Sequence, residues 1–209
     1  MNQIATPLKA GTSLANTVFL MGEMTAGKDY IGEILIKRGY KRIAFADALK
    51  EEVAAKHGIS VAELNANKAI YRRELQEWGA SQRAKNINYW VERFDEKLHN
   101  HNGLVVCTDT RHLNEATYAV SNVDNGVIVR IWTPWEVRKE RIKALYGEIP
   151  ADYHNHPSET EVAMCPFNIR ISGVLNNPEM IERELQATYA HWVGVGKPIY
   201  KEVLNIKMR

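Results

Sequence analysis

Residues 17–29 are Thr-Val-Phe-Leu-Met-Gly-Glu-Met-Thr-Ala-Gly-Lys-Asp, and this stretch decides the fold. The apolar run 17–21 predicts a buried strand, and Ile31, Ile34 and Leu35 then recur at helical spacing before Gly39. Between the two, residues 22–28 match G-x-x-x-x-G-K in the strand–loop–helix context that a phosphate-binding loop requires. The alternative is a glycine-containing turn that carries a lysine by chance. The flanking strand and helix favour the phosphate loop.

The residue types in this loop suit a nucleotide. Glycines let backbone N–H groups turn toward phosphates, and the N-terminus of the following helix adds its positive end. Lys28 supplies a point charge for the β- and γ-phosphates. Asp29 replaces the usual hydroxyl residue after the lysine, so it is a candidate Mg²⁺ ligand, either directly or through water. An equally open alternative is that Asp29 only complements the helix dipole.

A second carboxylate, Asp109, directly follows the apolar run 104–108. Carboxyl ends of parallel strands face the crevice in which such sheets bind ligands, so Asp109 can position Mg²⁺ from the other side. Its alternative role is to cap the next helix. Arg111 is then close enough to meet a phosphate, or it pairs on the surface with Glu115, four residues along.

Short β-rich runs alternate with helical patterns along the chain. The expected strands are 17–21, 42–45, 104–108, 127–132 and 167–171. Expected helix starts are the capping boxes Ser60–Glu63, Thr133–Glu136 and Ser158–Glu161 and the pair Asn177–Pro178, and residues 86–98 carry an apolar helical stripe. This order predicts an α/β fold with a parallel sheet wrapped by helices. About 60 residues separate the second and third strands, too many for one crossover helix, so we expect an inserted substrate-binding layer there.

One helix of this insertion presents a candidate ligand wall. Arg72, Gln76, Gly79 and Arg83 fall on one helical face, while Leu75 and Trp78 point toward packing. Guanidinium groups grip phosphate with paired hydrogen bonds, and the glycine leaves space for close approach. A solvated helix is the alternative, but a glycine there costs about 1 kcal/mol relative to alanine, so we favour the ligand wall.

Two further groups of residues near the insertion are weaker candidates. Asp47 lies at a strand-to-helix junction, where it either meets substrate or serves as an N-cap. Four aromatic residues are candidates to stack on a base, although a buried aromatic is more often part of the core; they are Phe45, Trp78, Tyr89 and Trp90.

The helix after Thr133 carries Arg138 and Arg141 three residues apart and leads into the loop-like segment 147–159. Arginines that enter from such a lid would neutralise charge on a transferring phosphoryl group. Pairing with glutamates on a solvated face is the alternative. His154 and His156 suggest a metal only weakly, because no array of acids or cysteines completes a site.

Composition limits the remaining possibilities. The 209 residues include 27 Lys+Arg and 25 Asp+Glu, and a net charge of +2 is too small for a protein that coats nucleic acid or an acidic membrane. No apolar run approaches the ~20 residues of a membrane helix, and Pro7 and Gly11 interrupt any signal peptide, so we expect a cytoplasmic location. Cys107 and Cys165 lie in apolar stretches and are expected to be reduced core residues.

Several of these motifs together resemble the deoxynucleoside monophosphate kinases of tailed bacteriophages, within the P-loop nucleotide kinases. The resemblance spans about residues 17–192 and rests on GEMTAGKD, FADALK, RxxLQxxG with the later Arg83, DTRHLNEA, WxxRxxR and HPSE. Tyr30 departs from the small hydroxyl residue that the family often has, which affects the expected metal coordination.

The resemblance implies a three-layer P-loop kinase fold with a five-stranded parallel sheet, a helical acceptor-binding insertion at about 46–103 and a lid at about 134–160. It implies transfer of the ATP γ-phosphoryl group to a deoxynucleoside monophosphate, with a homodimer plausible and a host-cytoplasmic location if the chain is phage-encoded. Residues 1–16 are expected to be a flexible tail before a single domain, 17–209.

Carried over residue by residue, the resemblance assigns roles to the candidates. The ATP-binding residues would be Gly22, Thr25, Ala26, Gly27, Lys28, Asp29 and Tyr30, with Asp29 and Asp109 organising Mg²⁺. The acceptor monophosphate would be surrounded by Asp47, Lys50, Arg72, Gln76, Arg83 and Arg111. Lys28, Arg138 and Arg141 would stabilise the transition state.

Two other functions remain open on the sequence. One is a P-loop kinase for another phosphorylated acceptor, such as phosphomevalonate or a coenzyme precursor, because the loop alone does not identify the acceptor. The other is a nucleotide-dependent switch, disfavoured because no NKxD-type signature is present: Asn67-Lys68 is followed by Ala69-Ile70. Nucleic-acid binding would need a larger basic excess.

Overall fold

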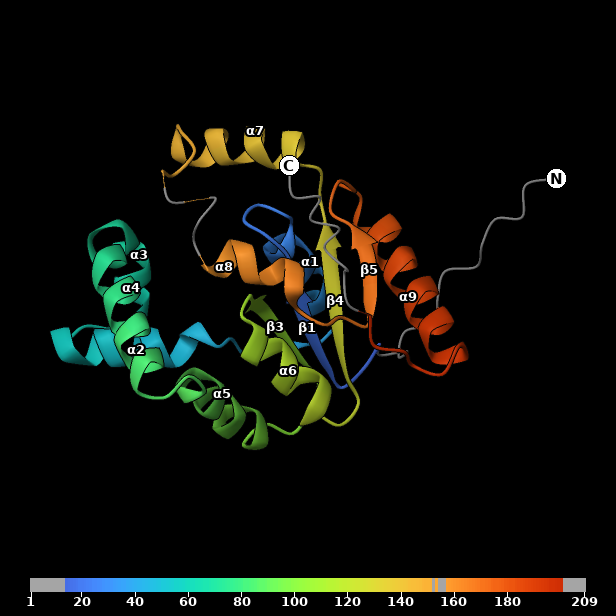
Figure 1. The fold of residues 1–209 in the computed structure, drawn as a ribbon, viewed down its shortest axis with the longest axis horizontal. Coiled ribbons are helices and arrows are strands. Elements are labelled where there is room, and N and C mark those ends of the chain that lie inside the picture. The colour runs from blue at the N-terminus through green and yellow to red at the C-terminus, as the bar shows by residue number, and fades with distance from the viewer. Residues whose placement is uncertain (1–13, 152, 154–156, 201–209) are drawn as a thin grey trace, which may run out of the picture.

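The computed structural model describes residues 14–151, 153 and 157–200. Its centre is a five-stranded sheet of β1 (Thr17–Met21), β2 (Lys41–Arg42), β3 (Val105–Thr110), β4 (Gly126–Trp132) and β5 (Ile169–Ser172). All neighbouring strands are parallel, in the order β2-β3-β1-β4-β5 (Figure 1). The predicted α/β class and five-stranded parallel sheet are confirmed.

Alternating side chains of β1 supply both faces of the sheet, because successive residues of a strand point to opposite sides. Val18 and Leu20 pack into a core with helices α1 (Lys28–Lys37) and α9 (Pro178–Gly194). Phe19 and Met21 face the other core, which includes residues of helix α6 (Leu113–Ser121). Every residue of β1 is buried, so the loop that follows it starts from a fixed point.

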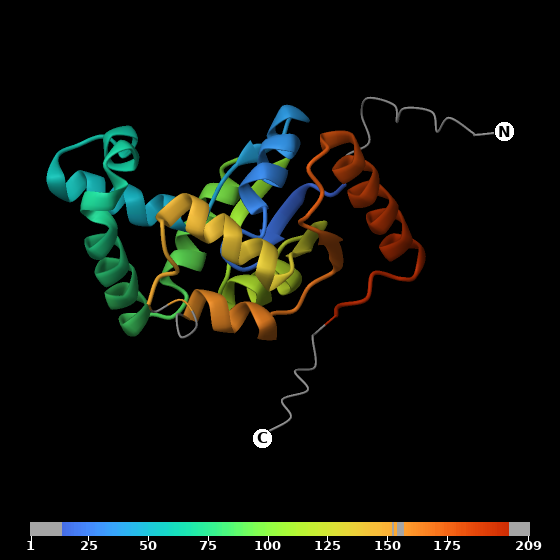
Figure 2. The ribbon, with the colours of Figure 1, turned by 90° about the horizontal axis from the view of Figure 1, so that it is seen from above.

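The segment between β2 and β3 forms the predicted helical insertion. It contains α2 (Ala46–His57), α3 (Val61–Ala66), α4 (Lys68–Lys85) and α5 (Tyr89–His99). Val53, Ala54, Leu64 and Leu75 give it a small core of its own. Both views show α2–α4 at one end of the molecule and α9 at the opposite end (Figure 2).

The remaining elements follow β4. Helix α7 (Trp135–Tyr146) runs above the phosphate loop in Figure 1, and α8 (Pro157–Thr160) with the 3₁₀ turn η2 (Glu161–Met164) leads back to β5. The predicted starts at Ser60 and Asn177 are confirmed, because each side chain accepts hydrogen bonds from the first turn of its helix. The predicted helix start at Ser158 is wrong, since α8 already begins at Pro157, and the Glu161 carboxylate accepts the Leu113 N–H.

Some predicted boundaries and features differ from the structure. The second strand is shorter than 42–45, since Ile43 to Phe45 already lead into α2. Leu14 and Ala15 are buried, and the Leu14 N–H donates to the Tyr40 hydroxyl, so these two residues are not part of a flexible tail, and residues 1–13 lie outside the described residues. His154 and His156 lie outside the described residues.

No helix in the described part of the chain is long and apolar enough to span a membrane. Cys107 and Cys165 are free and buried, as expected.

Candidate active site

The phosphate loop joins β1 to α1 and depends on its glycines. A Cβ added at Gly22 would lie 2.7 Å from the Ile131 carbonyl oxygen, so no larger residue fits between the loop and β4. Gly27 has φ 110° and precedes the first residue of α1. Only glycine adopts such a backbone readily. These two positions therefore set the turn that aims the N-terminus of α1 into the site.

Lys28 is almost fully buried, with 5% of its surface exposed. Its ammonium group donates to the carbonyl oxygens of Gly22 and Glu23, at 2.6 and 2.8 Å. Burial, helped by the positive charge of Arg111, lowers the pKa of Lys28 to about 7. A neighbouring polyphosphate would favour the charged form of this lysine. Acidic residues of the protein supply only part of the negative charge that would do so.

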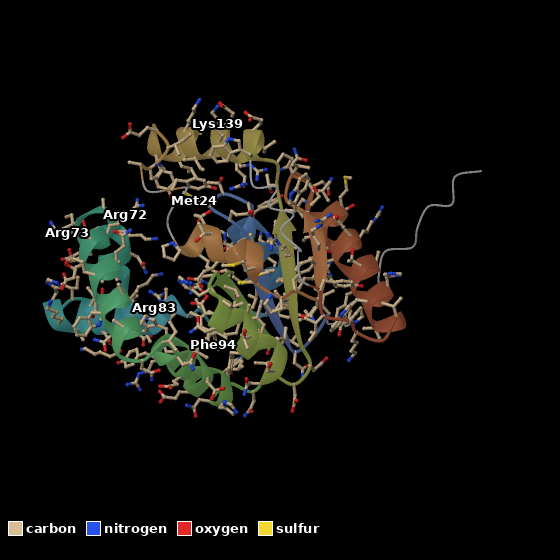
Figure 3. All side chains as sticks on the ribbon, in the orientation of Figure 1. Met24, Arg72, Arg73, Arg83, Phe94 and Lys139 are labelled. Atoms are coloured by element: carbon tan, nitrogen blue, oxygen red, sulfur yellow. The ribbon has the colours of Figure 1, made fainter. Side chains whose placement is uncertain are left out.

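Part of that negative charge comes from Glu159, a residue of α8. Its carboxylate accepts the Met24 N–H at 2.8 Å and lies 3.2 Å from the Arg111 guanidinium. Its side chain is only 5% exposed, and its charge raises the pKa of Lys28. Figure 3 labels Met24 on the loop, between α7 and α8. In the sequence Glu159 stands out only as the last residue of the HPSE motif, and the residue pattern predicts no contact for it.

The residues that directly follow β4 and β5, Thr133 and Gly173, contact the loop from the side of the sheet. The Thr133 hydroxyl donates to the Ala26 carbonyl at 2.8 Å. A Cβ at Gly173 would lie 2.1 Å from both the Ala26 oxygen and the Thr133 hydroxyl. The predicted capping box at Thr133 is therefore wrong, since this hydroxyl bonds the loop and α7 begins after Pro134 without a side-chain cap. Thr133 does form a side-chain hydrogen bond, but its partner is the phosphate loop and not the first turn of α7.

The two arginines of α7 connect that helix to the same region. Arg141 donates to the carbonyl oxygens of Thr25 and Gly173 at 3.1 and 3.0 Å. Arg138 donates to the Thr133 carbonyl at 3.1 Å, and its guanidinium lies 5.4 Å from the Trp135 ring centre. Both side chains thus border the loop, as the lid hypothesis requires. Their role in stabilising a transition state stays a prediction.

Buried Arg130 on β4 was not singled out from the sequence. It is fully buried in the strand, donates to the Val162 carbonyl at 2.6 Å and lies 3.9 Å from the Glu23 carboxylate. Glu23 is also 4.0 Å from Arg138. The sequence does show an arginine inside an apolar strand. Because burying a guanidinium is costly, such a residue indicates polar or acidic partners nearby, here Val162 and Glu23.

Asp109 and Asp47 have structural partners that the sequence did not predict. The two oxygens of Asp109 accept the N–H groups of Phe45 and Ala46, at 3.0 and 2.9 Å, so this carboxylate joins β3 to the start of α2. It does not cap the helix that follows it. Asp47 accepts the Ala44 N–H at 2.8 Å and pairs with Arg42 at 3.0 Å. Contact of either residue with Mg²⁺ or substrate stays a prediction.

Asp29 fits a metal better than Asp109 does. Its side chain is exposed in the first turn of α1, and it raises the pKa values of both Lys28 and Lys68, so it faces the charged site. No group of three or more metal-binding side chains occurs among the residues that the structure describes. A single carboxylate such as that of Asp29 suits Mg²⁺, which usually takes one or two carboxylates plus substrate phosphates. The Tyr30 hydroxyl donates to the Asn176 carbonyl at 2.8 Å and ties α1 to the β5–α9 loop.

Arg111 lies between the phosphate loop and the insertion. Its positive charge lowers the pKa of Lys28 and also that of Lys68 at the start of α4. The surface pair with Glu115 considered from the sequence does not form: Glu115 is buried and accepts the backbone N–H of Arg111 at 2.8 Å. Burial and the charge of Asp109 raise the pKa of Glu115 to about 7.

The predicted arginine face of α4 is only partly a ligand wall. Arg72 and Gln76 are exposed, and Arg83 is half-buried near His112, whose pKa it lowers (Figure 3). Gly79 is buried, and a Cβ there would lie in ordinary contact with Leu49 of α2 at 3.4 Å and with Arg83 at 3.5 Å. The expectation that it leaves space for a ligand stays a prediction.

Basic side chains nevertheless lie close together at the N-terminal end of α4. Lys50 and Arg72, together with Arg111, lower the pKa of Lys68, whose burial is the largest cause of the shift. Lys68 was not among the predicted site residues. The Arg72 guanidinium also lies 5.9 Å from the Tyr146 ring at the far end of α7. The insertion and α7 therefore border the same positively charged region.

The aromatic candidates for base stacking are engaged elsewhere. Phe45 and Trp90 are buried, and Phe45 stacks on Phe94 with ring centres 4.3 Å apart. Trp78 and Tyr89 both donate to the Glu52 carboxylate at 2.8 Å. The core alternative is confirmed for Phe45 and Trp90.

A hollow in the described part of the chain lies away from the phosphate loop, between α5 and α6. It has a volume of about 720 Å³. Its lining includes the acids Glu92, Asp95 and Glu161 and no lysine or arginine. An acidic hollow repels phosphates, so the loop region remains the candidate active site.

The amino-acid sequence matches the model of a known protein family. A family model described as phosphomevalonate kinase matches residues 20–125, about half of the chain, from the phosphate loop through the insertion to α6. The chain belongs to the phosphomevalonate kinase family. The match contains the loop, Lys28, all four insertion helices and Arg111 of this family member. No curated protein sequence matches the chain.

Solved structures agree on the fold. The crystal structure of TT1252 from Thermus thermophilus has a TM-score of 0.54 at 17% identity, covering 85% of this chain and 97% of its own. A gluconokinase from Sinorhizobium meliloti has a TM-score of 0.53 at 17% identity, with 88% and 97% covered. This member of the phosphomevalonate kinase family therefore has the P-loop kinase fold that the sequence predicted.

Proposed function

We propose that the chain is an ATP-dependent kinase that transfers the γ-phosphoryl group to a deoxynucleoside monophosphate. The observation that carries this proposal is the position of Arg111, which pairs at 3.2 Å with Glu159, the residue that accepts the Met24 N–H of the phosphate loop, and whose charge lowers the pKa of both Lys28 and Lys68. Two adjoining basic groups suit a reaction between two phosphates, one on the donor and one on the acceptor. The family to which the chain belongs is named for a kinase whose acceptor also carries a phosphate.

The protein's part in this reaction is positioning and charge. The loop N–H groups and Lys28 hold the β- and γ-phosphates, while Lys68, Arg72 and Arg111 orient the acceptor phosphate for in-line attack. Bound Mg²⁺, held by Asp29 and the phosphates, would supply further charge neutralisation. No residue acts as a covalent nucleophile, because an acceptor phosphate oxygen attacks directly.

The choice of a deoxynucleoside monophosphate rests on the resemblance of GEMTAGKD, FADALK and RxxLQxxG to the phage kinases. A second candidate acceptor is phosphomevalonate, favoured by the family match over residues 20–125. Both acceptors present a phosphate monoester to the same basic group. They differ in the base, which only the nucleotide has, so a direct comparison of acceptors separates them.

The test is an ADP-release assay with Mg²⁺-ATP, the four deoxynucleoside monophosphates, their ribose counterparts and phosphomevalonate, with Lys28→Ala as the blank. We expect ADP release that depends on one or more deoxynucleotides. Release only with phosphomevalonate would replace the nucleotide by the second candidate. ADP release that is equal without any acceptor would contradict the kinase assignment and favour a nucleotide-dependent switch.

A further inference from the structure

Glu159 is a carboxylate placed where a phosphate-binding site should repel one. It accepts the N–H of Met24, a residue of the phosphate loop, at 2.8 Å, and it pairs with Arg111 at 3.2 Å. Its side chain is 5% exposed, so solvent does little to screen its charge. It also stabilises the charged form of Lys28. Two groups of the site, the Met24 N–H and the Arg111 guanidinium, thus already contact one anion, and Lys28 feels its charge.

These partners are the groups that an incoming phosphate needs. A loop N–H, a guanidinium and a buried ammonium are the donors with which P-loop proteins hold phosphoryl oxygens. A carboxylate and a phosphoryl group that share these donors would also repel each other in a site of low dielectric. Both anions cannot keep the same contacts at once.

Lys28 supports the same conclusion independently. Its ammonium group donates to the carbonyl oxygens of Gly22 and Glu23 within its own loop. The lysine and the Met24 N–H are therefore both occupied by groups of the protein.

We propose that Glu159 takes the place of a phosphoryl group at the phosphate loop and is displaced when a polyphosphate binds. This inference rests on the proposed function only in taking residues 22–28 as a phosphate site. The displaced carboxylate releases Arg111 and the Met24 N–H to the ligand. Glu159 is thus a residue that sets phosphate affinity, and it opposes binding.

The experiment measures the Kd of inorganic tripolyphosphate and of ATP by calorimetry for the wild-type protein and Glu159→Gln. The amide keeps an oxygen that accepts the Met24 N–H but lacks the charge, so we expect the Kd to fall about tenfold. Glu159→Ala, which also removes the charge, should shift the Kd in the same direction and serves if Glu159→Gln does not fold. Tripolyphosphate has no base or ribose, so its Kd reports on the phosphate contacts alone.

Glu161→Gln is the matched control, because it removes a carboxylate two residues away that bonds Leu113 and pairs with His112 at 3.3 Å. We expect its Kd values to equal those of the wild-type protein. Unchanged or weaker binding by both Glu159 variants, with normal binding by the wild-type protein, overturns this inference and leaves the proposed function standing. If neither tripolyphosphate nor ATP binds the wild-type protein, the proposed function itself fails, and this inference fails with it.

Discussion

At the residue scale, Lys28 combines burial with a position against the carbonyl oxygens of its own loop. In the proposed reaction Lys28 supplies charge at the β- and γ-phosphates, so we expect Lys28→Ala to lower the rate of phosphoryl transfer on the order of 10²- to 10³-fold. Thermal unfolding and the far-ultraviolet circular dichroism spectrum should stay close to those of the wild-type protein. Normal turnover in a folded variant would remove Lys28 from the mechanism.

The lowered pKa of Lys28 gives a second prediction. With a pKa of about 7, the lysine is mostly neutral at pH 8 in the free protein, and a bound polyphosphate raises that pKa. Binding of ATP at pH 8 should therefore take up protons, and binding at pH 6 should take up fewer. Calorimetry in two buffers of different ionisation enthalpy measures this uptake. Equal uptake by Lys28→Ala would assign the protons to another group.

Sequence reasoning at this scale found the charged residues but not what they bond. The spacing of the loop identified Lys28, and the strand end identified Asp109, because both follow from local order. It missed that Asp109 accepts two N–H groups of a distant segment, 63 and 64 residues away in the chain. Such partners depend on tertiary packing, which one-dimensional periodicity does not contain.

At the scale of elements, the turn between β5 and α9 supports the phosphate loop through Gly173. A Cβ there would lie 2.1 Å from two oxygens, those of Ala26 and Thr133, so one of these elements must move. We expect Gly173→Ala to weaken ATP binding at least tenfold and to destabilise the fold by about 1–3 kcal/mol. Kd by calorimetry and urea unfolding check both effects.

Gly194 offers a matched control for that substitution. It is the last residue of α9, and nothing lies within 4 Å of a Cβ added there. Gly194→Ala should leave ATP binding unchanged and be neutral or stabilising by up to about 1 kcal/mol, because alanine favours a helix. Equal losses in Gly173→Ala and Gly194→Ala would show that the β5–α9 turn does not support the loop.

The elements themselves were largely predictable from local signals. Residues 17–21, Ser60 and Asn177 gave the first strand and two helix starts because apolar runs and capping side chains act over a few residues. The two-residue strand β2 was placed too far along the chain, since its pairing with β3 and not its own composition defines it. The Thr133 hydroxyl was predicted to cap α7 and instead bonds Ala26, because this partner is also set by tertiary packing and not by the neighbouring sequence.

At the scale of the whole molecule, burial of charged groups should make stability depend on pH. Glu115 has a pKa raised from 4.5 to about 7, so between these values the native state binds more protons than the unfolded state. By linkage, its contribution to stability is fully present below pH 4.5 and is lost as the pH rises through about 7. A shift of this size corresponds to at most about 3 kcal/mol. Lys28 acts in the opposite direction, because its lowered pKa makes stability rise with pH above about 7.

A comparison of variants separates these two contributions. Glu115→Gln keeps an oxygen for the N–H groups of Arg111 and His112 but does not titrate. The free energy of unfolding of wild-type protein minus that of Glu115→Gln, from urea unfolding at pH 5 to 8, should therefore fall as the pH rises. The same difference for Lys28→Met should rise between pH 7 and 9. A flat difference for Glu115→Gln would mean that this carboxyl group titrates normally, and that its two N–H partners and Arg83 offset the burial that raises its pKa.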